Sequence, residues 1–255
     1  MRIPEAPDNG CAWITGASSG MGLGMAKMLA DAGWRVAISA RSTEKLEAAA
    51  RDSNGQIIAM PVDVTDEADM RKTAELIESE AGPVTLAIMN AGTYTPVDAE
   101  SFDAGSVRKQ MEVNYFGAVN GIAAVLPGMT DRRSGHLALV ASPTSYRGLP
   151  RAGAYGAAKS AMVSLAESLK FDCDRLGLDI SVILPGFVRT AMTEQNDFDM
   201  PFLMEPDEAV RRILDGLARR RFEIAFPKRL VWPMKITRAM PCSWYFPLMA
   251  RLTRQ

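Results

Sequence analysis

The chain has 255 residues, of which 47% are hydrophobic and 23% are charged, and its formal net charge at pH 7 is −1. This composition is typical of a globular protein with a sizeable core, and the charge balance argues against a dedicated nucleic-acid-binding protein. No uncharged apolar run of about 18 residues occurs and the N-terminus lacks an apolar stretch, so we expect neither a membrane-spanning helix nor a signal peptide. Cys11, Cys173 and Cys242 lack CxxC spacing, which predicts buried free thiols in a reducing cytoplasm and no metal site.

Short apolar runs rich in Val and Ile alternate with longer segments of helical periodicity. Strands that are apolar throughout and separated by helices indicate a parallel sheet covered on both faces. We therefore predict a three-layer, doubly wound α/β fold with about seven parallel strands in one domain, 1–255. In chain order the predicted elements are strand 11–15, helix 21–32, strand 35–40, helix 44–52, strand 56–62, helix 67–80, strand 86–90, helix 106–126, strand 135–141, helix 155–176, strand 179–184, helix 206–219 and strand 223–226.

A glycine-rich stretch, TGASSGMG at 15–22, follows the first predicted strand and opens the first predicted helix. Gly16, Gly20 and Gly22 permit a tight turn and a close approach of the backbone to a pyrophosphate. The free amide hydrogens and the dipole of the helix favour an anion there. The alternative is a strand-to-helix turn without a ligand, but its place after the first strand of an alternating α/β pattern favours nucleotide binding.

The end of the second predicted strand distinguishes NAD from NADP. An acidic side chain there would bind the ribose hydroxyls and repel a 2′-phosphate, whereas this chain has Ala40 followed by Arg41 and Ser42. Arg41 can form charge-assisted hydrogen bonds with a phosphate, or it is a solvated arginine at a helix start. Taken together these residues favour NADP, with NAD the weaker prediction.

The segment YGAAK places Tyr155 and Lys159 four residues apart, on one face of the predicted helix. An ammonium beside a phenol favours the phenolate and lowers a pKa that is ordinarily about 10. The pair is therefore a candidate proton donor and acceptor. Such a spacing also occurs by chance, so its weight comes from the other motifs.

With these residues together, the chain resembles the single-domain short-chain dehydrogenase/reductase family over about residues 10–227, a core with a C-terminal appendage at 228–255. No single element is decisive, but their order and spacing are specific. The resemblance rests on TGASSGMG at 15–22, Asp63, NAG at 90–92, Asn114, Ser142, YGAAK at 155–159, and PG at 185–186 followed by Thr190.

This resemblance implies a Rossmann fold and assigns catalytic roles to four residues. Tyr155 would be the general acid in carbonyl reduction and the general base in alcohol oxidation, while Lys159 would lower its pKa and bind the nicotinamide ribose. Ser142 would bind the substrate oxygen, and Asn114 would sit at a helix distortion and hold a water linking Lys159 to solvent. The residues expected to bind the cofactor are Gly16, Ser18, Ser19, Gly20, Met21, Gly22, Arg41, Asp63, Val64, Asn90, Ala91, Gly92, Tyr155, Lys159, Pro185, Gly186, Val188 and Thr190.

Several of these roles have alternatives. Asn114 could be an exposed helix residue, and Ser142 could merely end a strand, with Ser145 in its place. Asp63 is expected to receive the adenine amino group, although Asp66 or Thr65 could equally cap the following helix. Two departures from the family pattern stand out: Pro143, which lacks an amide hydrogen, follows Ser142, and Ser19 stands where NADP-preferring relatives often have a basic residue.

The loop from Arg189 to Pro206 is apolar, and it either covers the substrate or packs against a neighbouring subunit. Its apolar residues are Met192, Phe198, Met200, Phe202, Leu203 and Met204. The single histidine, His136, begins the fifth predicted strand and is expected to be structural.

Residues 224–255 contain no acidic side chain but six basic ones, interleaved with aromatic and aliphatic residues. Four prolines there would break any long helix, so we predict an irregular appendage. Contact with an anionic membrane surface is one hypothesis; oligomer contacts or a wall of the substrate cleft are the others. The basic residues are Lys228, Arg229, Lys235, Arg238, Arg251 and Arg254, and the prolines are Pro227, Pro233, Pro241 and Pro247.

The leading interpretation is a cytoplasmic NADP-dependent oxidoreductase that interconverts a ketone or aldehyde and an alcohol, on a bulky apolar small molecule. By resemblance we expect a homodimer or homotetramer assembled through the helices at 106–126 and 155–176. A dinucleotide-sensing regulator without catalysis is the alternative, but such a protein should have lost Tyr155 or Lys159. Sugar-nucleotide epimerisation would need a larger C-terminal substrate domain.

Overall fold

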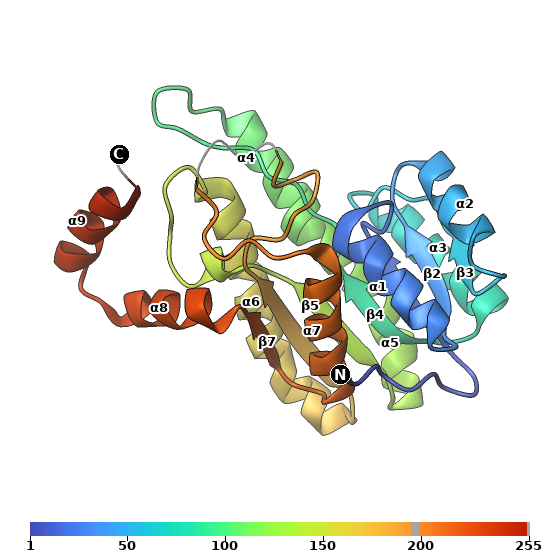
Figure 1. Cartoon of the computed structure of the whole chain (residues 1–255). Helices are drawn as coiled ribbons and strands as arrows, with labels where there is room; N and C mark the ends of the chain where they lie inside the picture. Colours follow the sequence, from blue (N-terminus) through green and yellow to red (C-terminus); the bar gives the residue numbers. More distant parts are fainter. Residues whose placement is uncertain (195–198, 254–255) are drawn as a thin grey trace.

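The computed structural model describes residues 1–194 and 199–253. Within them the strands form one parallel sheet in the order β3-β2-β1-β4-β5-β6-β7, with helices on both faces (Figure 1). This confirms the three-layer α/β fold with seven parallel strands. The strands are β1 (Cys11–Thr15), β2 (Arg35–Ser39), β3 (Ile57–Ala59), β4 (Val84–Met89), β5 (His136–Val140), β6 (Asp179–Pro185) and β7 (Glu223–Phe226).

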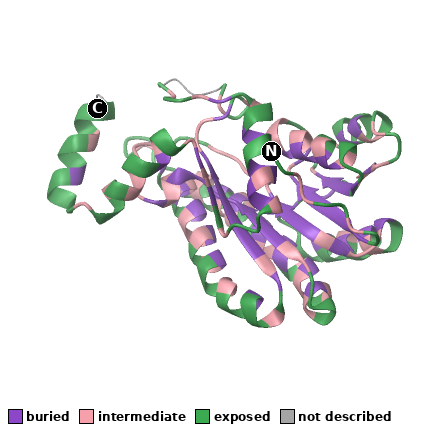
Figure 2. Cartoon of the chain, turned by 60° about the horizontal axis from the view of Figure 1, so that its bottom comes forward, coloured by how far each residue is buried: buried purple, intermediate pink, exposed green. Residues whose placement is uncertain are grey.

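Helices on both faces leave the strands largely buried (Figure 2). Because alternate side chains point to opposite faces of the sheet, a strand contributes residues to the core on each side. In β1, Cys11 and Trp13 join the core under one layer of helices, whereas Ala12 and Ile14 join the core under the other. Helices α3 (Glu67–Ala81), α5 (Gly117–Arg132) and α6 (Gly153–Leu176) cover the first face, and α1 (Gly20–Asp31), α2 (Thr43–Arg51) and α7 (Pro206–Ala218) cover the second.

The helix predicted at 106–126 is in fact three segments. Helix α4 (Ala104–Met111) continues through a π-helical turn, η1 (Glu112–Phe116), into α5, which passes Pro127 and ends at Arg132. The prediction ended six residues too early, and the last turns continue past Pro127, with Met129 fully buried in the core. Strand β3 is shorter than predicted, since only its middle pairs with β2.

The prediction of an irregular C-terminal appendage is wrong, because the structure has two helices there. These are α8 (Lys228–Ala239) and α9 (Cys242–Thr253), and each contains a proline as its sixth residue. At this interior position a proline has no amide to donate to the carbonyl four residues earlier, yet each helix continues beyond it. Pro241 separates the two helices, which is the break that the sequence did anticipate.

All three cysteines are free, but only two are buried. Cys11 lies at the start of β1, where burial raises the pKa of its thiol to about 12. The expectation of a buried thiol is wrong for Cys242, which is exposed on α9 and accepts a hydrogen bond from Arg147 Nη2 at 3.3 Å.

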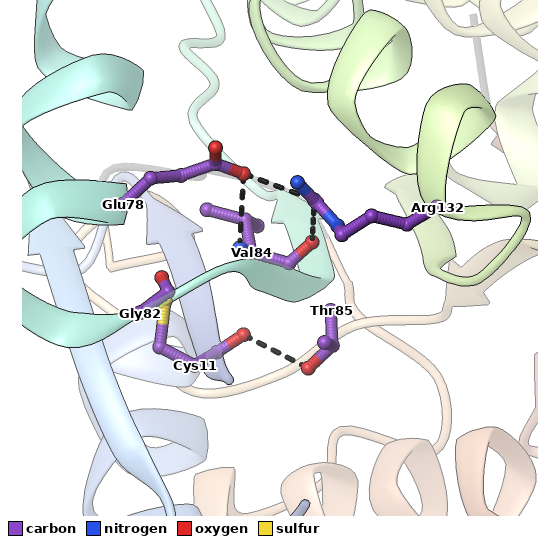
Figure 3. Close-up of polar contacts among 6 residues, drawn as sticks. All are labelled: Cys11, Glu78, Gly82, Val84, Thr85 and Arg132. Carbon is purple, nitrogen blue, oxygen red and sulfur yellow. Dashed lines mark hydrogen bonds and ion pairs between the residues drawn. The ribbon is translucent and has the colours of Figure 1, made fainter. Parts of the chain in front are cut away.

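At the edge of the sheet where strands begin, a polar cluster joins α3 and α5, two helices on the same face of the sheet, to β4 (Figure 3). Glu78 of α3 accepts hydrogen bonds from the Val84 amide at 3.2 Å and from Arg132 Nη2 of α5 at 2.9 Å. Arg132 also donates to the Val84 carbonyl at 3.3 Å, and Thr85 Oγ1 donates to the Cys11 carbonyl at 3.2 Å. These contacts satisfy backbone groups that the sheet ladder leaves unpaired at its end.

We predict that Arg132→Ala lowers the free energy of unfolding by about 1 kcal/mol, because it leaves the Val84 carbonyl and one Glu78 oxygen without their shared donor. Urea unfolding measures the change. Lys72→Ala is the control: its ion pair with Asp69 is exposed at 3.4 Å, so the expected loss is below about 0.5 kcal/mol. Equal losses in the two variants would contradict this role of Arg132.

Candidate active site

The glycine turn after β1 is packed so closely that side chains are excluded from it. A Cβ on Gly22 would lie 2.5 Å from the Gly16 carbonyl oxygen, and a Cβ on Gly16 would lie 2.6 Å from Ala91 Cα. Gly16 and Gly20 have positive φ angles of 65° and 55°. The glycines therefore let the turn pack against Ala91 and the Asn90 side chain, where no side chain of its own would fit, and a tight glycine turn before a helix is the form that a pyrophosphate site requires.

The first turn of α1 leaves its amide groups available to a ligand. Ser19 is the N-cap residue, yet its side chain makes no capping hydrogen bond. Ser18 and Met21 are half-buried on either side of it. Thr190, which is distant in sequence, lies beside this turn: a Cβ on Gly20 would be 3.2 Å from Thr190 Cγ2. The positive end of the α1 dipole thus faces a space bordered by the glycine turn and by the segment that contains Thr190.

Asn90 ties the end of β4 to the glycine turn. Its Nδ2 donates to the carbonyls of Thr15 and Gly16, both at 3.0 Å, and its own amide donates to Thr15 Oγ1 at 3.0 Å. The Ala91 amide also donates to Thr15 Oγ1, at 3.2 Å. Thr15 was missed in the sequence, although a buried hydroxyl at the end of a central strand was a usable signal.

At the end of β2, Arg41 is exposed two residues beyond the last strand residue. Asp63, which follows β3, accepts hydrogen bonds from the Thr65 amide and hydroxyl, and these bonds together with the Arg41 charge lower the pKa of its carboxyl. Asp66 caps α3 by accepting from Asp69, so Asp63 is left with a turn role and an exposed carboxylate. Val64 is buried, and its carbonyl accepts from Asn120 Nδ2 at 2.9 Å.

The catalytic candidates meet where β5 ends and α6 begins. Ser142 is the residue after Val140 and Ala141, and its side chain is hydrogen-bonded to Tyr155 in the first turn of α6. Burial raises the pKa of Tyr155 to about 12, although the Ser142 bond opposes the shift. Tyr94 packs edge-on against Tyr155 with ring centroids 5.6 Å apart, so an aromatic wall stands beside the hydroxyl.

Lys159 is buried one turn further along α6. Its Nζ donates to the Val140 carbonyl at 2.7 Å and lies 5.6 Å from the Tyr155 ring centroid. Burial lowers its pKa to about 7. The expectation that Lys159 lowers the Tyr155 pKa is therefore not met in this structure: the ammonium is directed to a strand carbonyl, and burial dominates both groups.

Asn114 is fully buried in η1, so the exposed-residue alternative is wrong, and the helix distortion expected there is present. Its Nδ2 donates to the Thr93 and Gln110 carbonyls, both at 2.8 Å, and its Oδ1 accepts from the Thr93 amide at 2.9 Å. A Cβ on Gly92 would lie 2.9 Å from Asn114 Oδ1 and 3.7 Å from Lys159 Nζ, which places the two side chains together.

Because both amide hydrogens of Asn114 are used, only its oxygen side or its backbone can serve a water. Gln110, four residues earlier and also buried, holds the next loop residue, since Gln110 and Thr95 exchange two hydrogen bonds at 3.0 and 3.1 Å. Gln110 was not among the residues predicted from the sequence, although its spacing from Asn114 puts both on one helix face.

The loop after Ser142 forms a short 3-10 helix, η2 (Pro143–Ser145). Pro143 is its first residue, where no amide donor is needed, so the departure from the family pattern is accommodated. Ser145 Oγ donates to the Ser142 carbonyl at 2.7 Å, so it supports Ser142 and does not replace it. The Thr144 hydroxyl is buried without a hydrogen-bond partner among the described residues.

The segment after β6 closes the site from the other side. Pro185 ends β6, and the Gly186 amide donates to the Phe226 carbonyl at 2.7 Å. Val188 is buried and pairs with Met204, and the Thr190 amide donates to Thr193 Oγ1 at 2.9 Å. In the apolar loop Met192 and Phe202 are exposed, whereas Phe198 lies outside the described residues.

Two other features carry no chemistry at this site. His136 lies at the start of β5, hydrogen-bonded to Ser181 Oγ at 2.7 Å, and burial lowers its pKa to about 4. Among residues 1–194 and 199–253, no group of three or more acidic, histidine or cysteine side chains could hold a metal ion, and no helix has the length and apolarity needed to cross a bilayer.

Comparisons with known proteins agree with this architecture. A family model described as short chain dehydrogenase matches residues 10–200. An uncharacterized oxidoreductase of Myxococcus xanthus is 35% identical over 233 residues, 90% of this chain and 92% of that protein. The 17-beta-hydroxysteroid dehydrogenase 13 of Rattus norvegicus is 30% identical over 240 residues, 92% of this chain and 78% of that protein. A solved structure from Burkholderia phymatum, a short chain dehydrogenase/reductase in complex with NAD, has a TM-score of 0.82 at 23% identity, covering 89% of this chain and 92% of that one.

The buried Lys159 predicts a pH dependence of stability in the cofactor-free protein. Its pKa falls from 10.5 to about 7 on folding, so between these values the unfolded chain binds the proton more tightly and stability rises with pH. From pH 6.5 to 9, wild type should gain about 2 kcal/mol relative to Lys159→Met in urea unfolding. Parallel pH profiles would show that Lys159 keeps its ordinary pKa.

Proposed function

The chain belongs to the short-chain dehydrogenase family and is an oxidoreductase, and from this premise we propose that it interconverts a ketone or aldehyde and the corresponding alcohol. The observation that carries the proposal is the grouping of Ser142, Tyr155 and Lys159 beside Asn114 and Gly92. The fold of this family binds a nicotinamide dinucleotide, which supplies the hydride when bound. The backbone-lined glycine turn suits its pyrophosphate.

The proposed proton chemistry follows from the pKa shifts. With a pKa near 12, the Tyr155 hydroxyl is protonated at neutral pH and can donate its proton to a carbonyl oxygen as that oxygen gains negative charge. Ser142, hydrogen-bonded to Tyr155, would donate to the same oxygen and orient it. Lys159, which is buried one helical turn from Tyr155 and has a pKa near 7, would exchange protons with the Tyr155 hydroxyl. In alcohol oxidation the same groups act in reverse.

NADP is the proposed cofactor. Arg41 is exposed just beyond β2, and the position before it holds Ala40 and no acidic side chain. Because Arg41 also lowers the pKa of Asp63, the two side chains interact electrostatically, which leaves Arg41 near the adenosine end of the proposed site. A guanidinium there would bind a 2′-phosphate in two hydrogen bonds.

The substrate is proposed to be a bulky apolar molecule. Tyr94 lies against Tyr155, and Met192 and Phe202 are exposed on the loop that follows β6. The name of the rat relative denotes a hydroxysteroid, which is an apolar secondary alcohol. Together these support a site for a large hydrophobic carbonyl or alcohol.

The assembly is proposed to be a homodimer or homotetramer through the long helices. Phe171 on α6 is 80% exposed, and Phe116 at the end of η1 is 44% exposed, so both present aromatic surface to solvent in the single chain. A cytoplasmic setting is part of the proposal, supported by the three free cysteines.

Tyr155→Phe should lower the turnover of a ketone panel with NADPH by about 10³-fold, because the proton donor is removed. Binding of NADPH, followed by its fluorescence, should weaken far less than turnover, because Tyr155 is only one of the residues expected to hold the cofactor. Tyr146→Phe is the matched control: its hydroxyl belongs to the same loop region but bonds Glu223 at 3.2 Å, so turnover should persist. Full activity in Tyr155→Phe would remove this residue from the mechanism.

Arg41→Ala should raise the KM for NADPH by about 10- to 100-fold, the loss expected for a charge-assisted hydrogen bond, and should leave that for NADH nearly unchanged. Arg51→Ala, an exposed arginine on α2, serves as the control. If both cofactors weaken equally in Arg41→Ala, the residue does not discriminate between them.

A further inference from the structure

Helices α8 and α9 form a C-terminal arm, residues 228–253, that the proposed chemistry does not use. The arm follows the edge strand β7 and extends away from the sheet, and most of its surface is exposed (Figures 1 and 2). It also lies outside residues 10–200, the part matched by the family model. Its surface therefore calls for a separate explanation.

The arm is held in a defined position by the loop that follows Ser142. Arg147 donates to the carbonyls of Thr237 and Met240 at the end of α8, and its guanidinium lies 4.0 Å from the ring centroid of Tyr245. The Tyr245 hydroxyl donates to the Gly148 carbonyl at 2.5 Å, and Tyr245 is buried. These contacts orient both helices against the same loop.

Near the start of α8, the packing reaches the segment after β6. Val231 is buried, and Leu230 lies so close to Gly186 that a Cβ there would be 2.8 Å from Leu230 Cδ2. The face of α8 that carries Leu230 and Val231 is thus covered by the rest of the chain. Because side chains recur on one face of a helix at fixed spacing, those on the opposite face are left exposed to solvent.

The outer face of the arm is apolar. On α8, Trp232 and Ile236 are four residues apart and are 61% and 64% exposed. On α9, Trp244, Leu248 and Leu252 recur every four residues and are all exposed, next to the buried Tyr245. Single exposed apolar residues are ordinary, but the two helices together expose these five and Phe246, at 64%, which is more apolar side chain than a solitary soluble chain usually presents.

Basic side chains surround this apolar surface. Residues 224–255 carry six of the 29 basic side chains and none of the 30 acidic ones, so the preceding residues carry 23 basic and 30 acidic side chains. Within the described part of the arm, Lys235 pairs with Glu223, whereas Lys228, Arg229, Arg238 and Arg251 make no ion pair. The cations are therefore available to an anionic partner.

We propose that the arm binds the surface of an anionic lipid bilayer, with its tryptophans at the boundary of the acyl chains and its cations among the headgroups. Tryptophan and leucine on one face with lysine and arginine beside them is the composition that binds such an interface. A second copy of the arm fits less well, because a symmetric contact would bring the unpaired cations of both copies together.

Intrinsic fluorescence tests this directly, because the four tryptophans divide into two classes. Trp13 and Trp34 are 0% and 4% exposed, whereas Trp232 and Trp244, at 61% and 69%, lie on the arm. With the full-length protein, vesicles of phosphatidylcholine and phosphatidylglycerol should shift the emission to shorter wavelength and protect it from iodide. Phosphatidylcholine alone should do neither, and added salt should weaken the effect.

Two double variants separate charge from apolar contact in vesicle flotation. Lys228→Glu/Arg229→Glu and Trp232→Ser/Trp244→Ser should each reduce binding to anionic vesicles by about tenfold or more. Their matched controls are Lys27→Glu/Arg51→Glu and Leu76→Ser/Phe102→Ser, which alter exposed residues away from the arm and should bind as wild type does. Thermal unfolding verifies that every variant is folded.

Three outcomes would overturn the proposal. One is the absence of vesicle flotation by wild type. Another is an equal loss of binding in the control variants, which would mean that the whole protein surface binds the vesicles nonspecifically. The third is a fall in sedimenting mass for Trp232→Ser/Trp244→Ser without any lipid binding by wild type, which would assign the outer face to a second copy of the chain.

Discussion

The bonds between Thr15 and Asn90 connect the two halves of the site, and most of its geometry depends on them. Strands β1 and β4 are adjacent and parallel, so their carboxyl ends lie side by side. Asn90 uses that adjacency to hold the carbonyls of Thr15 and Gly16, while Thr15 Oγ1 holds the Asn90 amide. The glycine turn and the NAG segment are thereby fixed relative to each other, with no room between them for a Cβ on Gly16 or Gly22.

From this junction the contacts extend to α6, the helix of the proposed catalytic residues. Gly92 brings the backbone within reach of Asn114 and Lys159, and Asn114 in turn holds Thr93 on both its amide and its carbonyl. The π-helical turn interrupts the regular helix between α4 and α5, and Asn114 within it is buried. A series of short contacts thus leads from the glycine turn to Lys159 and the proposed proton donor Tyr155, and at Gly16, Gly22 and Gly92 it leaves no room for a larger residue.

Burial sets the electrostatics of the catalytic pair. Both charged forms, phenolate and ammonium, lose hydration in the same buried region, so the pKa of Tyr155 rises and that of Lys159 falls. In the cofactor-free protein burial thus disfavours the charged form of each member of the pair. The loop that supplies Ser142 also supplies Arg147, which holds the C-terminal arm, so the reactive edge of the sheet and the proposed lipid-binding surface share one support.

The three layers, the parallel sheet and the glycine turn could be predicted from the amino-acid sequence alone, because they follow from local periodicity and from glycines at positions that need their backbone freedom. The sequence also identified Asn114, Ser142, Tyr155 and Lys159 as candidates, since their spacing along the chain is itself the signal. It did not reveal Thr15 or Gln110, whose importance arises from partners 75 and 15 residues away. Nor could it give the direction of the Tyr155 shift or the two helices of the arm. These features became visible in the folded chain, because desolvation and helix docking depend on the groups that surround a residue in space, and segments far apart in the chain contribute those groups.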